Sequence, residues 1–136
     1  MSDSIKILKD NFKNIGGFIE ANNYKLIDVK EDYALMEAKL NDNSMNPYGI
    51  AHGGYLFGLV DTCAGVAAST NGLQALTLNS SINYLNACKS DLIKAEANAI
   101  KSGKHIKVYE VNIYDGDKVI CNGTVSYYVM DIKLEK

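Results

Sequence analysis

Residues 46–61 read NPYGIAHGGYLFGLVD, and this stretch runs from a loop into the longest helix that the sequence predicts. Asparagine, proline and glycine favour a turn over residues 46–49. From residue 54 to about residue 70 the side chains are mostly apolar or small, and Asn71-Gly72 is a common left-handed stop signal. Asp61 is the only charged residue in this segment. We therefore expect a long helix that is poor in charge.

Segments with strand character precede and follow this helix. Two lie before it, at about residues 24–30 and 33–40, and the charged pair Glu31 and Asp32 between them suits a hairpin. Four lie after it, at about residues 76–85, 92–101, 105–114 and 118–130, with turns at 102–104 and 115–117. This order predicts an α+β fold in which an antiparallel sheet covers the central helix.

The first residues of the chain predict a shorter, amphipathic helix. Its apolar side chains recur at steps of three and four residues: Ile5, Leu8, Phe12 and Ile15. The polar residues at positions 2–4 can cap this helix, and the glycines at 16 and 17 can end or bend it.

The composition is that of an ordinary globular protein, and we expect one domain over residues 1–136. Hydrophobic residues make up 47% of the chain, charged residues 22%, and the formal net charge is −2. Arginine is absent, which disfavours a nucleic-acid partner. The first residues lack the uninterrupted apolar stretch typical of a signal peptide, and no apolar run elsewhere has the length of a membrane span. The three cysteines suit neither a disulfide framework nor a zinc site. We expect a cytoplasmic protein with no membrane segment.

The opening stretch concentrates the residues that can carry chemistry: Asn46, Gly49, His52, Gly53, Gly54 and Asp61. Two glycines at a helix start leave backbone N–H groups open to an oxygen that gains negative charge in a transition state. Asp61 follows about two helical turns later and projects from nearly the same side. Simpler interpretations are a plain turn for the glycines, a surface carboxylate for Asp61 and a backbone hydrogen bond for His52.

Gly58 and Gly65 lie on the same side of the predicted helix as Asp61. Glycine inside a helix costs about 1 kcal/mol relative to alanine, so two of them need an explanation. Our hypothesis is that they give a substrate or a second backbone room beside the acid.

Other kinds of site find little support. The sequence holds no Gly-x-Ser-x-Gly elbow, phosphate-binding loop or dinucleotide fingerprint. His52 and His105 are the only histidines, so we predict no metal and no cofactor. Cys63 is expected to be a small buried hydrophobe rather than a nucleophile.

The string from Asn46 to Asp61 resembles the active-site segment of the hotdog-fold acyl-CoA thioesterases, in the branch that includes the phenylacetate-pathway enzymes. The likeness continues through the strand at residues 77–85 and covers nearly the whole chain in order. It implies a hotdog fold, a sheet wrapped around a long central helix. It also implies an enzyme that hydrolyses an acyl- or aryl-CoA thioester to a free acid and coenzyme A.

The resemblance also implies roles for individual residues. The Gly53 N–H would polarise the thioester carbonyl, and Asp61 of the neighbouring subunit would act as general base or nucleophile. A homodimer would be the minimal active unit, and two dimers would pair into a homotetramer in the family pattern. Asn46 and His52 would shape the carbonyl pocket, and Thr77 would help to hold the water. The residues implied to bind the substrate are Gly54, Tyr84, Lys101, Gly103 and Lys104.

Two other functions remain open at this point. One is a hotdog dehydratase or hydratase, although that chemistry generally uses a histidine base at a different spacing. The other is a non-catalytic module that binds or senses acyl-CoA. A transcriptional regulator of this kind would need an additional DNA-binding helix pair, and the sequence shows none.

Overall fold

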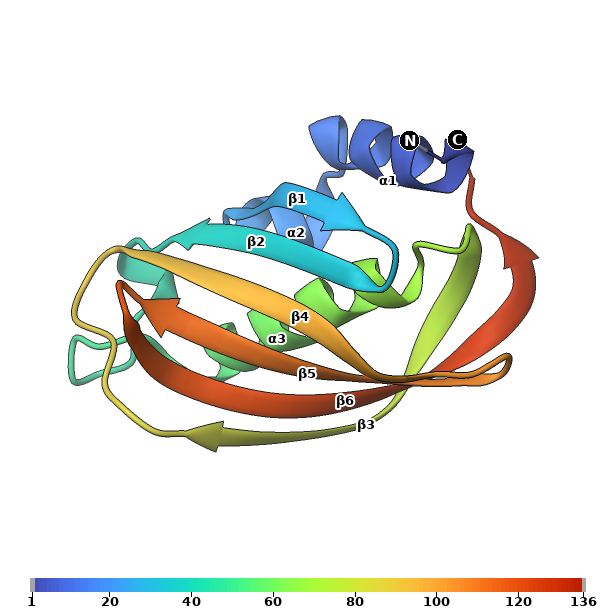
Figure 1. Cartoon of the computed structure of the whole chain (residues 1–136). Helices are drawn as coiled ribbons and strands as arrows, with labels where there is room; N and C mark the ends of the chain where they lie inside the picture. Colours follow the sequence, from blue (N-terminus) through green and yellow to red (C-terminus); the bar gives the residue numbers. More distant parts are fainter. Residues whose placement is uncertain (1, 136) are drawn as a thin grey trace.

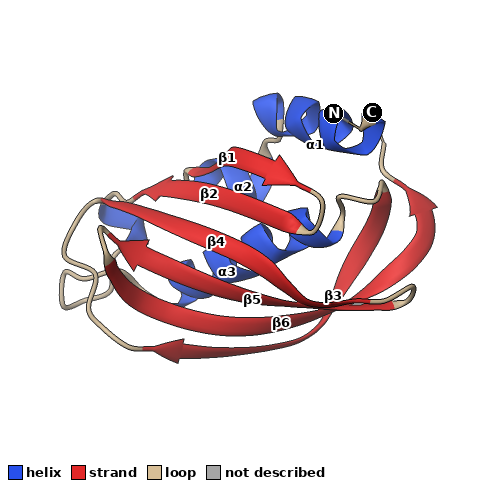
Figure 2. Ribbon diagram, in the orientation of Figure 1, coloured by secondary structure: helices blue, strands red, loops and turns tan. Residues whose placement is uncertain are grey.

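A computed structural model describes residues 2–135 and places one long helix against a curved sheet (Figure 1). The helices are α1 (Asp3–Asn11), α2 (Gly17–Ala21) and α3 (Gly53–Ala68), with 3-10 turns η1 (Phe12–Asn14) and η2 (Asp42–Ser44). The strands are β1 (Tyr24–Lys30), β2 (Tyr33–Lys39), β3 (Leu73–Tyr84), β4 (Leu92–Ser102), β5 (Ile106–Asp115) and β6 (Lys118–Lys133). They form one antiparallel sheet in the order β1-β2-β4-β5-β6-β3. The predicted α+β fold, a sheet wrapped around a central helix, is confirmed (Figure 2).

The N-terminal region differs from its prediction. The Ser2 side chain caps α1 as expected, accepting a hydrogen bond from the Ile5 N–H at 3.3 Å. The helix ends at Asn11, before the apolar pattern does, and the 3-10 turn η1 follows. Gly16 and Gly17 have φ values of 67° and 58°, which break the helix and start the short helix α2 in a new direction. The sequence did not predict α2.

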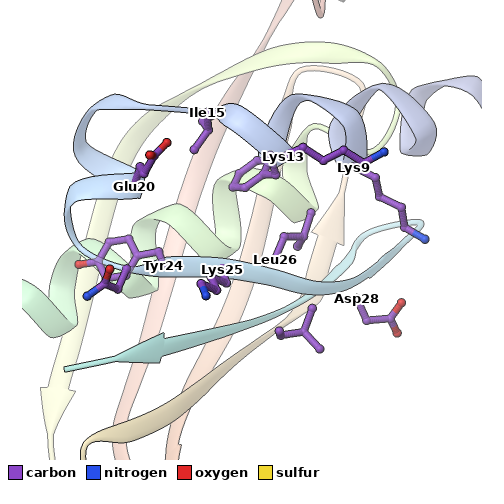
Figure 3. A pocket seen from close by; sticks show the side chains of 11 residues that line it. Lys9, Lys13, Ile15, Glu20, Tyr24, Lys25, Leu26 and Asp28 are labelled. Atoms are coloured by element: carbon purple, nitrogen blue, oxygen red, sulfur yellow. The ribbon is translucent and has the colours of Figure 1, made fainter.

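A hollow of about 650 Å³ lies between α1 and β1. Figure 3 shows the side chains that line it, among them Lys9, Lys13 and Tyr24. None of the predicted site residues takes part in its lining. This hollow therefore does not mark the site that the sequence predicts.

Small residues let α3 approach the middle of the sheet closely. Four alanines of β2 and β4 are fully buried: Ala34, Ala38, Ala95 and Ala97. The Cys63 thiol reaches between these strands, with Sγ 3.5 Å from the Ala34 carbonyl oxygen and 3.4 Å from that of Ala95. Burial raises the pKa of this thiol, which agrees with the predicted role as a buried hydrophobe. No helix within residues 2–135 has the length and apolar character needed to cross a bilayer.

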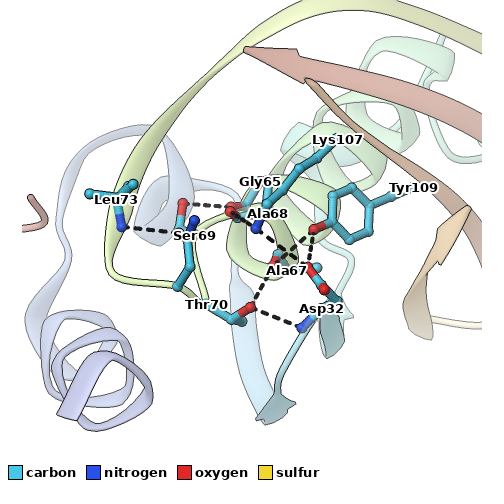
Figure 4. A network of polar contacts seen from close by, with 10 residues as sticks. Asp32, Gly65, Ala67, Ala68, Ser69, Thr70, Leu73, Lys107 and Tyr109 are labelled. Atoms are coloured by element: carbon cyan, nitrogen blue, oxygen red, sulfur yellow. Dashed lines mark hydrogen bonds and ion pairs between the residues drawn. The ribbon is translucent and has the colours of Figure 1, made fainter. Parts of the chain in front are cut away.

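A polar network fastens the C-terminal end of α3 to the β1–β2 turn (Figure 4). The Tyr109 hydroxyl donates to Asp32 Oδ1 at 2.5 Å, and Lys107 Nζ lies 3.5 Å from the same oxygen. Lys107, only 4% exposed, also donates to the Ala68 carbonyl oxygen at 3.4 Å. The Asp32 N–H donates to Thr70 Oγ1 at 2.9 Å. A buried ammonium thus meets the negative end of the helix dipole.

The ionised form of Asp32 is favoured by this network. Burial alone would raise the pKa of Asp32, but hydrogen bonds from Tyr109 and Ser102 and the charge of Lys107 outweigh it and hold the pKa below its usual value. A carboxyl group whose pKa is lower in the folded state stabilises the fold above the unfolded pKa of about 3.9. That contribution is lost as the pH falls through the folded pKa.

We predict that Asp32→Asn lowers the free energy of unfolding at pH 7 by about 2 kcal/mol, because Lys107 loses its carboxylate partner. Asparagine tolerates the φ of 54° at this position, so the backbone turn is retained. As the pH falls below about 4 and through the folded pKa of Asp32, the stabilities of parent and variant should approach each other. Urea unfolding between pH 3 and 7 measures this, with the exposed Asp131→Asn as control. Two parallel stability curves would contradict the prediction.

Candidate active site

The loop before α3 is held by the side chain of Asn46. Asn46 Oδ1 accepts hydrogen bonds from the N–H groups of Tyr48 at 2.9 Å and Ile50 at 3.3 Å. The Gly49 N–H donates to the Asn46 carbonyl oxygen at 3.1 Å, and Gly49 has a φ of 79° that favours glycine. The predicted turn at residues 46–49 is therefore present, and Asn46 shapes the loop that leads to the helix.

His52 caps the start of α3. Its Nδ1 accepts a hydrogen bond from the Gly54 N–H at 2.8 Å, which is the backbone role that the sequence left open for this residue. Gly53 is the first residue of the helix, and within residues 2–135 its N–H has no acceptor. The cap thus uses the Gly54 donor and leaves the Gly53 donor for an oxygen from outside the chain.

A small apolar hollow lies beside Gly53. The Tyr84 hydroxyl donates to the Gly53 carbonyl oxygen at 2.9 Å, which holds the end of β3 against the helix start. The hollow has a volume of about 320 Å³, and its lining includes Gly53, Tyr84, Ile50, Leu56 and Leu85. Gly53, whose N–H has no acceptor within residues 2–135, is therefore part of the wall of this hollow.

The Asp61 carboxylate is held by two hydroxyl groups from the sheet. Thr77 Oγ1 and Tyr127 Oη each donate to Asp61 Oδ1 at 2.8 Å. These two residues are direct cross-strand partners in the pairing of β3 with β6. The lone acid of the apolar helix therefore has two hydrogen-bond partners, and both engage the same oxygen. The resemblance implied that Thr77 helps to hold a water molecule; the structure places its hydroxyl on Asp61 and adds Tyr127, which the sequence did not predict.

Gly53 and Asp61 do not meet within one chain. They are eight residues apart on the same helix, which corresponds to about 12 Å along its axis. A carbonyl group bound to the Gly53 N–H would therefore be out of reach of the Asp61 carboxylate of the same protomer.

The geometry agrees with the comparison to known proteins. The family model described as "Thioesterase superfamily" matches residues 48–122, which is more than half of the chain. The chain belongs to the thioesterase superfamily. This confirms the resemblance drawn from residues 46–61, and the matched segment contains both Gly53 and Asp61.

Similar proteins of this superfamily span most of the chain. A hypothetical thioesterase of Streptococcus pneumoniae, solved with coenzyme A, is 32% identical with a TM-score of 0.77, covering 82% of this chain and 89% of that one. The Escherichia coli PaaI structure has a TM-score of 0.89 at 22% identity and covers 98% of this chain and all of that one, which supports the hotdog fold. At the sequence level the acyl-coenzyme A thioesterase PaaI of E. coli is 29% identical over 89 residues, covering 65% of this chain and 64% of that protein.

The predicted basic turn lies at the other end of α3. Gly103 and Lys104 line a hollow of about 630 Å³ together with Thr70 and Asn71, which follow the helix. Gly103 has a local reason to be glycine, since a Cβ there would lie 2.7 Å from the Ile106 carbonyl oxygen. Lys101 lies on β4 just before this turn and does not line the hollow. Within one protomer this group is separate from Gly53 and Tyr84.

The hypothesis about Gly58 is wrong. A Cβ at Gly58 would lie 2.7 Å from Tyr24 Oη and 3.0 Å from Phe18 Cζ, so this glycine accommodates side chains of the same chain rather than a substrate. Tyr24 cannot move away easily, because it is buried and its hydroxyl donates to the Tyr55 carbonyl oxygen at 2.5 Å. At Gly65 a Cβ would lie 3.5 Å from Tyr127 Oη, an ordinary contact.

We predict that Gly58→Ala lowers the free energy of unfolding by about 1 to 2 kcal/mol, since the steric overlap with Tyr24 exceeds the gain in helix propensity. Gly65→Ala is the matched control and should be neutral or slightly stabilising. Chemical denaturation of both variants measures the difference. Equal stabilities for the two variants would show that the Tyr24 contact does not require glycine.

Proposed function

We propose that this member of the thioesterase superfamily is an acyl-CoA thioesterase that hydrolyses the thioester of an acyl- or aryl-CoA. The observation that carries the proposal is the Asp61 carboxylate, held through Oδ1 by two hydroxyls while Oδ2 has no partner within residues 2–135. A carboxylate fixed through one oxygen can use the other on water or on a carbonyl carbon. The coenzyme A bound to the S. pneumoniae relative supports this substrate class.

The reaction needs two groups of the protein. The Gly53 N–H, at the positive end of the helix dipole, donates to the thioester carbonyl oxygen as negative charge develops there. Asp61 Oδ2 accepts a proton from a water molecule, which attacks the carbonyl carbon. The carbon–sulfur bond then breaks, the thiolate of coenzyme A takes the proton back from Asp61, and the free acid is released. Direct attack by Asp61, followed by hydrolysis of the anhydride, uses the same geometry.

The site is proposed to lie between two protomers. Because Gly53 and Asp61 are about 12 Å apart along one helix, the carboxylate that serves Gly53 comes from the partner subunit. A homodimer is therefore the minimal active unit, and a homotetramer is its proposed assembly. The lysines at 101 and 104 provide cations for the phosphates of coenzyme A, as point charges, since no arginine is present.

We predict that Asp61→Asn lowers kcat for acyl-CoA hydrolysis at least about a hundredfold, because the amide cannot accept the proton of water. The Asn side chain can still accept both hydroxyl hydrogen bonds, so fold and oligomeric state should be retained. The measurement is the rate at which coenzyme A thiol is released from a panel of acyl- and aryl-CoA substrates, detected with a disulfide-exchange reagent. Parental rates in the folded variant would contradict the catalytic assignment. A parent that binds acyl-CoA without releasing thiol would be a binding module instead.

We predict that Gly53→Pro lowers kcat about a hundredfold or more, because proline removes the one N–H that polarises the carbonyl. Proline suits the first position of a helix, and the extended conformation of His52 (φ −66°, ψ 136°) is compatible with a following proline. Gly53→Ala is the matched control, since it keeps the N–H and its Cβ would meet the Tyr84 ring at 3.4 Å. Equal activity of the two variants would exclude this N–H from catalysis.

The shared site can be tested with the same variants. Co-expression of Gly53→Pro and Asp61→Asn chains makes mixed dimers, each with one site in which both groups are intact. Random pairing should restore roughly a quarter of the parental activity, although each variant alone is inactive. Absence of complementation in isolated mixed dimers would place both groups of each site in the same chain.

A further inference from the structure

We propose that Tyr127 is a positioning residue for Asp61, which orients the carboxylate so that Oδ2 is presented to the reacting water or carbonyl. This inference rests on the proposed thioesterase function and adds a residue to it. Tyr127 is a buried residue of β6 that lies more than sixty positions after Asp61 in the sequence.

The Tyr127 hydroxyl has a fixed place beside Asp61. It lies 2.8 Å from Asp61 Oδ1 and 2.6 Å from the Asp61 carbonyl oxygen. The residue is 2% exposed, and its ring packs edge-on against Tyr109 with the centroids 6.3 Å apart. The pairing of β6 with β3 sets Tyr127 directly opposite Thr77, the second donor to Oδ1. The phenol therefore cannot turn to bulk water, and its proton is directed at Asp61.

The Tyr127 hydroxyl has two acceptors within reach, Asp61 Oδ1 and the Asp61 carbonyl oxygen. This arrangement suits a carboxylate that gains and loses a proton during the reaction. When Asp61 is ionised, Oδ1 is the stronger acceptor, and the hydrogen bond stabilises the charge. When Asp61 has taken a proton from water, the Tyr127 hydroxyl can turn to the Asp61 carbonyl oxygen and remains satisfied. The residue thus favours the form of Asp61 that starts the reaction, without leaving a buried donor unpaired afterwards.

Two ionisable groups of the same protomer near this carboxylate, Tyr127 and Cys63, remain neutral. Burial, and then the adjacent Asp61 charge, raise the pKa of Tyr127, so the phenol is a donor throughout the working range of pH. The Cys63 thiol on the same helix points to carbonyl oxygens of β2 and β4, and burial raises its pKa as well. A change in the acid limb of the pH profile on removing the Tyr127 hydroxyl would therefore not come from Tyr127 or Cys63.

The test is Tyr127→Phe in the full-length protein, assayed with an acyl-CoA that the parent hydrolyses. We expect kcat to fall roughly tenfold to a hundredfold with little change in KM, the effect of losing one hydrogen bond to a charged group. The acid limb of the kcat profile should move to higher pH, because the ionised carboxylate has lost a donor. If this variant is recovered unfolded, 4-fluorophenylalanine at position 127 keeps the size of the side chain without the donor, and the same loss is expected.

Tyr109→Phe is the matched control. Tyr109 is a buried tyrosine on the neighbouring strand whose hydroxyl also donates to a carboxylate, but it binds Asp32 at the C-terminal end of α3. This variant should lose comparable stability while keeping the parental kcat and pH profile. A Tyr127→Phe enzyme with parental kcat and profile, alongside an inactive Asp61→Asn, would overturn the role of Tyr127 and leave the proposed function standing. A parent inactive on the whole panel would overturn both.

Discussion

The Asp61 carboxylate on an otherwise apolar helix is the constraint that links the fold to the site. A charged group on the covered face of such a helix is costly unless it receives hydrogen bonds. The sheet supplies them through one cross-strand pair, Thr77 and Tyr127, whose hydroxyls reach the same oxygen. If the pairing of β3 with β6 slipped by one residue, the side chain of the displaced strand, Thr77 or Tyr127, would turn to the other face of the sheet. Asp61 would then lose that hydrogen-bond donor. The register of β3 against β6 is therefore a requirement of the site as well as of the core.

The two ends of α3 differ in how their backbone hydrogen-bonding groups are satisfied. At its C-terminal end the buried Lys107 donates to the Ala68 carbonyl oxygen and meets Asp32, so the negative end of the dipole is covered from within the chain. At its N-terminal end the His52 side chain accepts from the Gly54 N–H, and the neighbouring Gly53 N–H has no acceptor among the described residues. The fold thus covers one end of the helix from within the chain, and the other end is where the proposed thioester carbonyl would bind.

The sequence predicted the local structure well, because periodicity and turn residues are local signals. All six strands and α3 lie within about three residues of their predicted bounds, and α1 forms near the predicted start but ends at Asn11. What could not be predicted came from residues distant in sequence. Tyr127 lies in the last predicted strand, and nothing local in the sequence singles it out. A buried tyrosine needs a partner for its hydroxyl, but the sequence does not show that this partner is Asp61. Gly58 was expected to leave room for a substrate or a second backbone near Asp61. Only the structure shows that Tyr24 and Phe18 occupy that space. The short helix α2 was missed because it depends on two successive glycines with positive φ.

The separation of Gly53 and Asp61 also constrains how two protomers would form the proposed site. A two-fold axis creates two identical sites when it exchanges the N–H of one helix with the carboxylate of the other, so it must pass midway between them. The midpoint of residues 53 and 61 is Phe57, a large apolar side chain that is 37% exposed on a helix whose other large residues are buried. Residues near such an axis contact their own copies, and an exposed aromatic ring suits a self-complementary contact. The eight-residue separation that keeps the Gly53 N–H away from the Asp61 carboxylate within one chain would therefore bring them together between two chains, if the two copies of α3 packed antiparallel about an axis near Phe57.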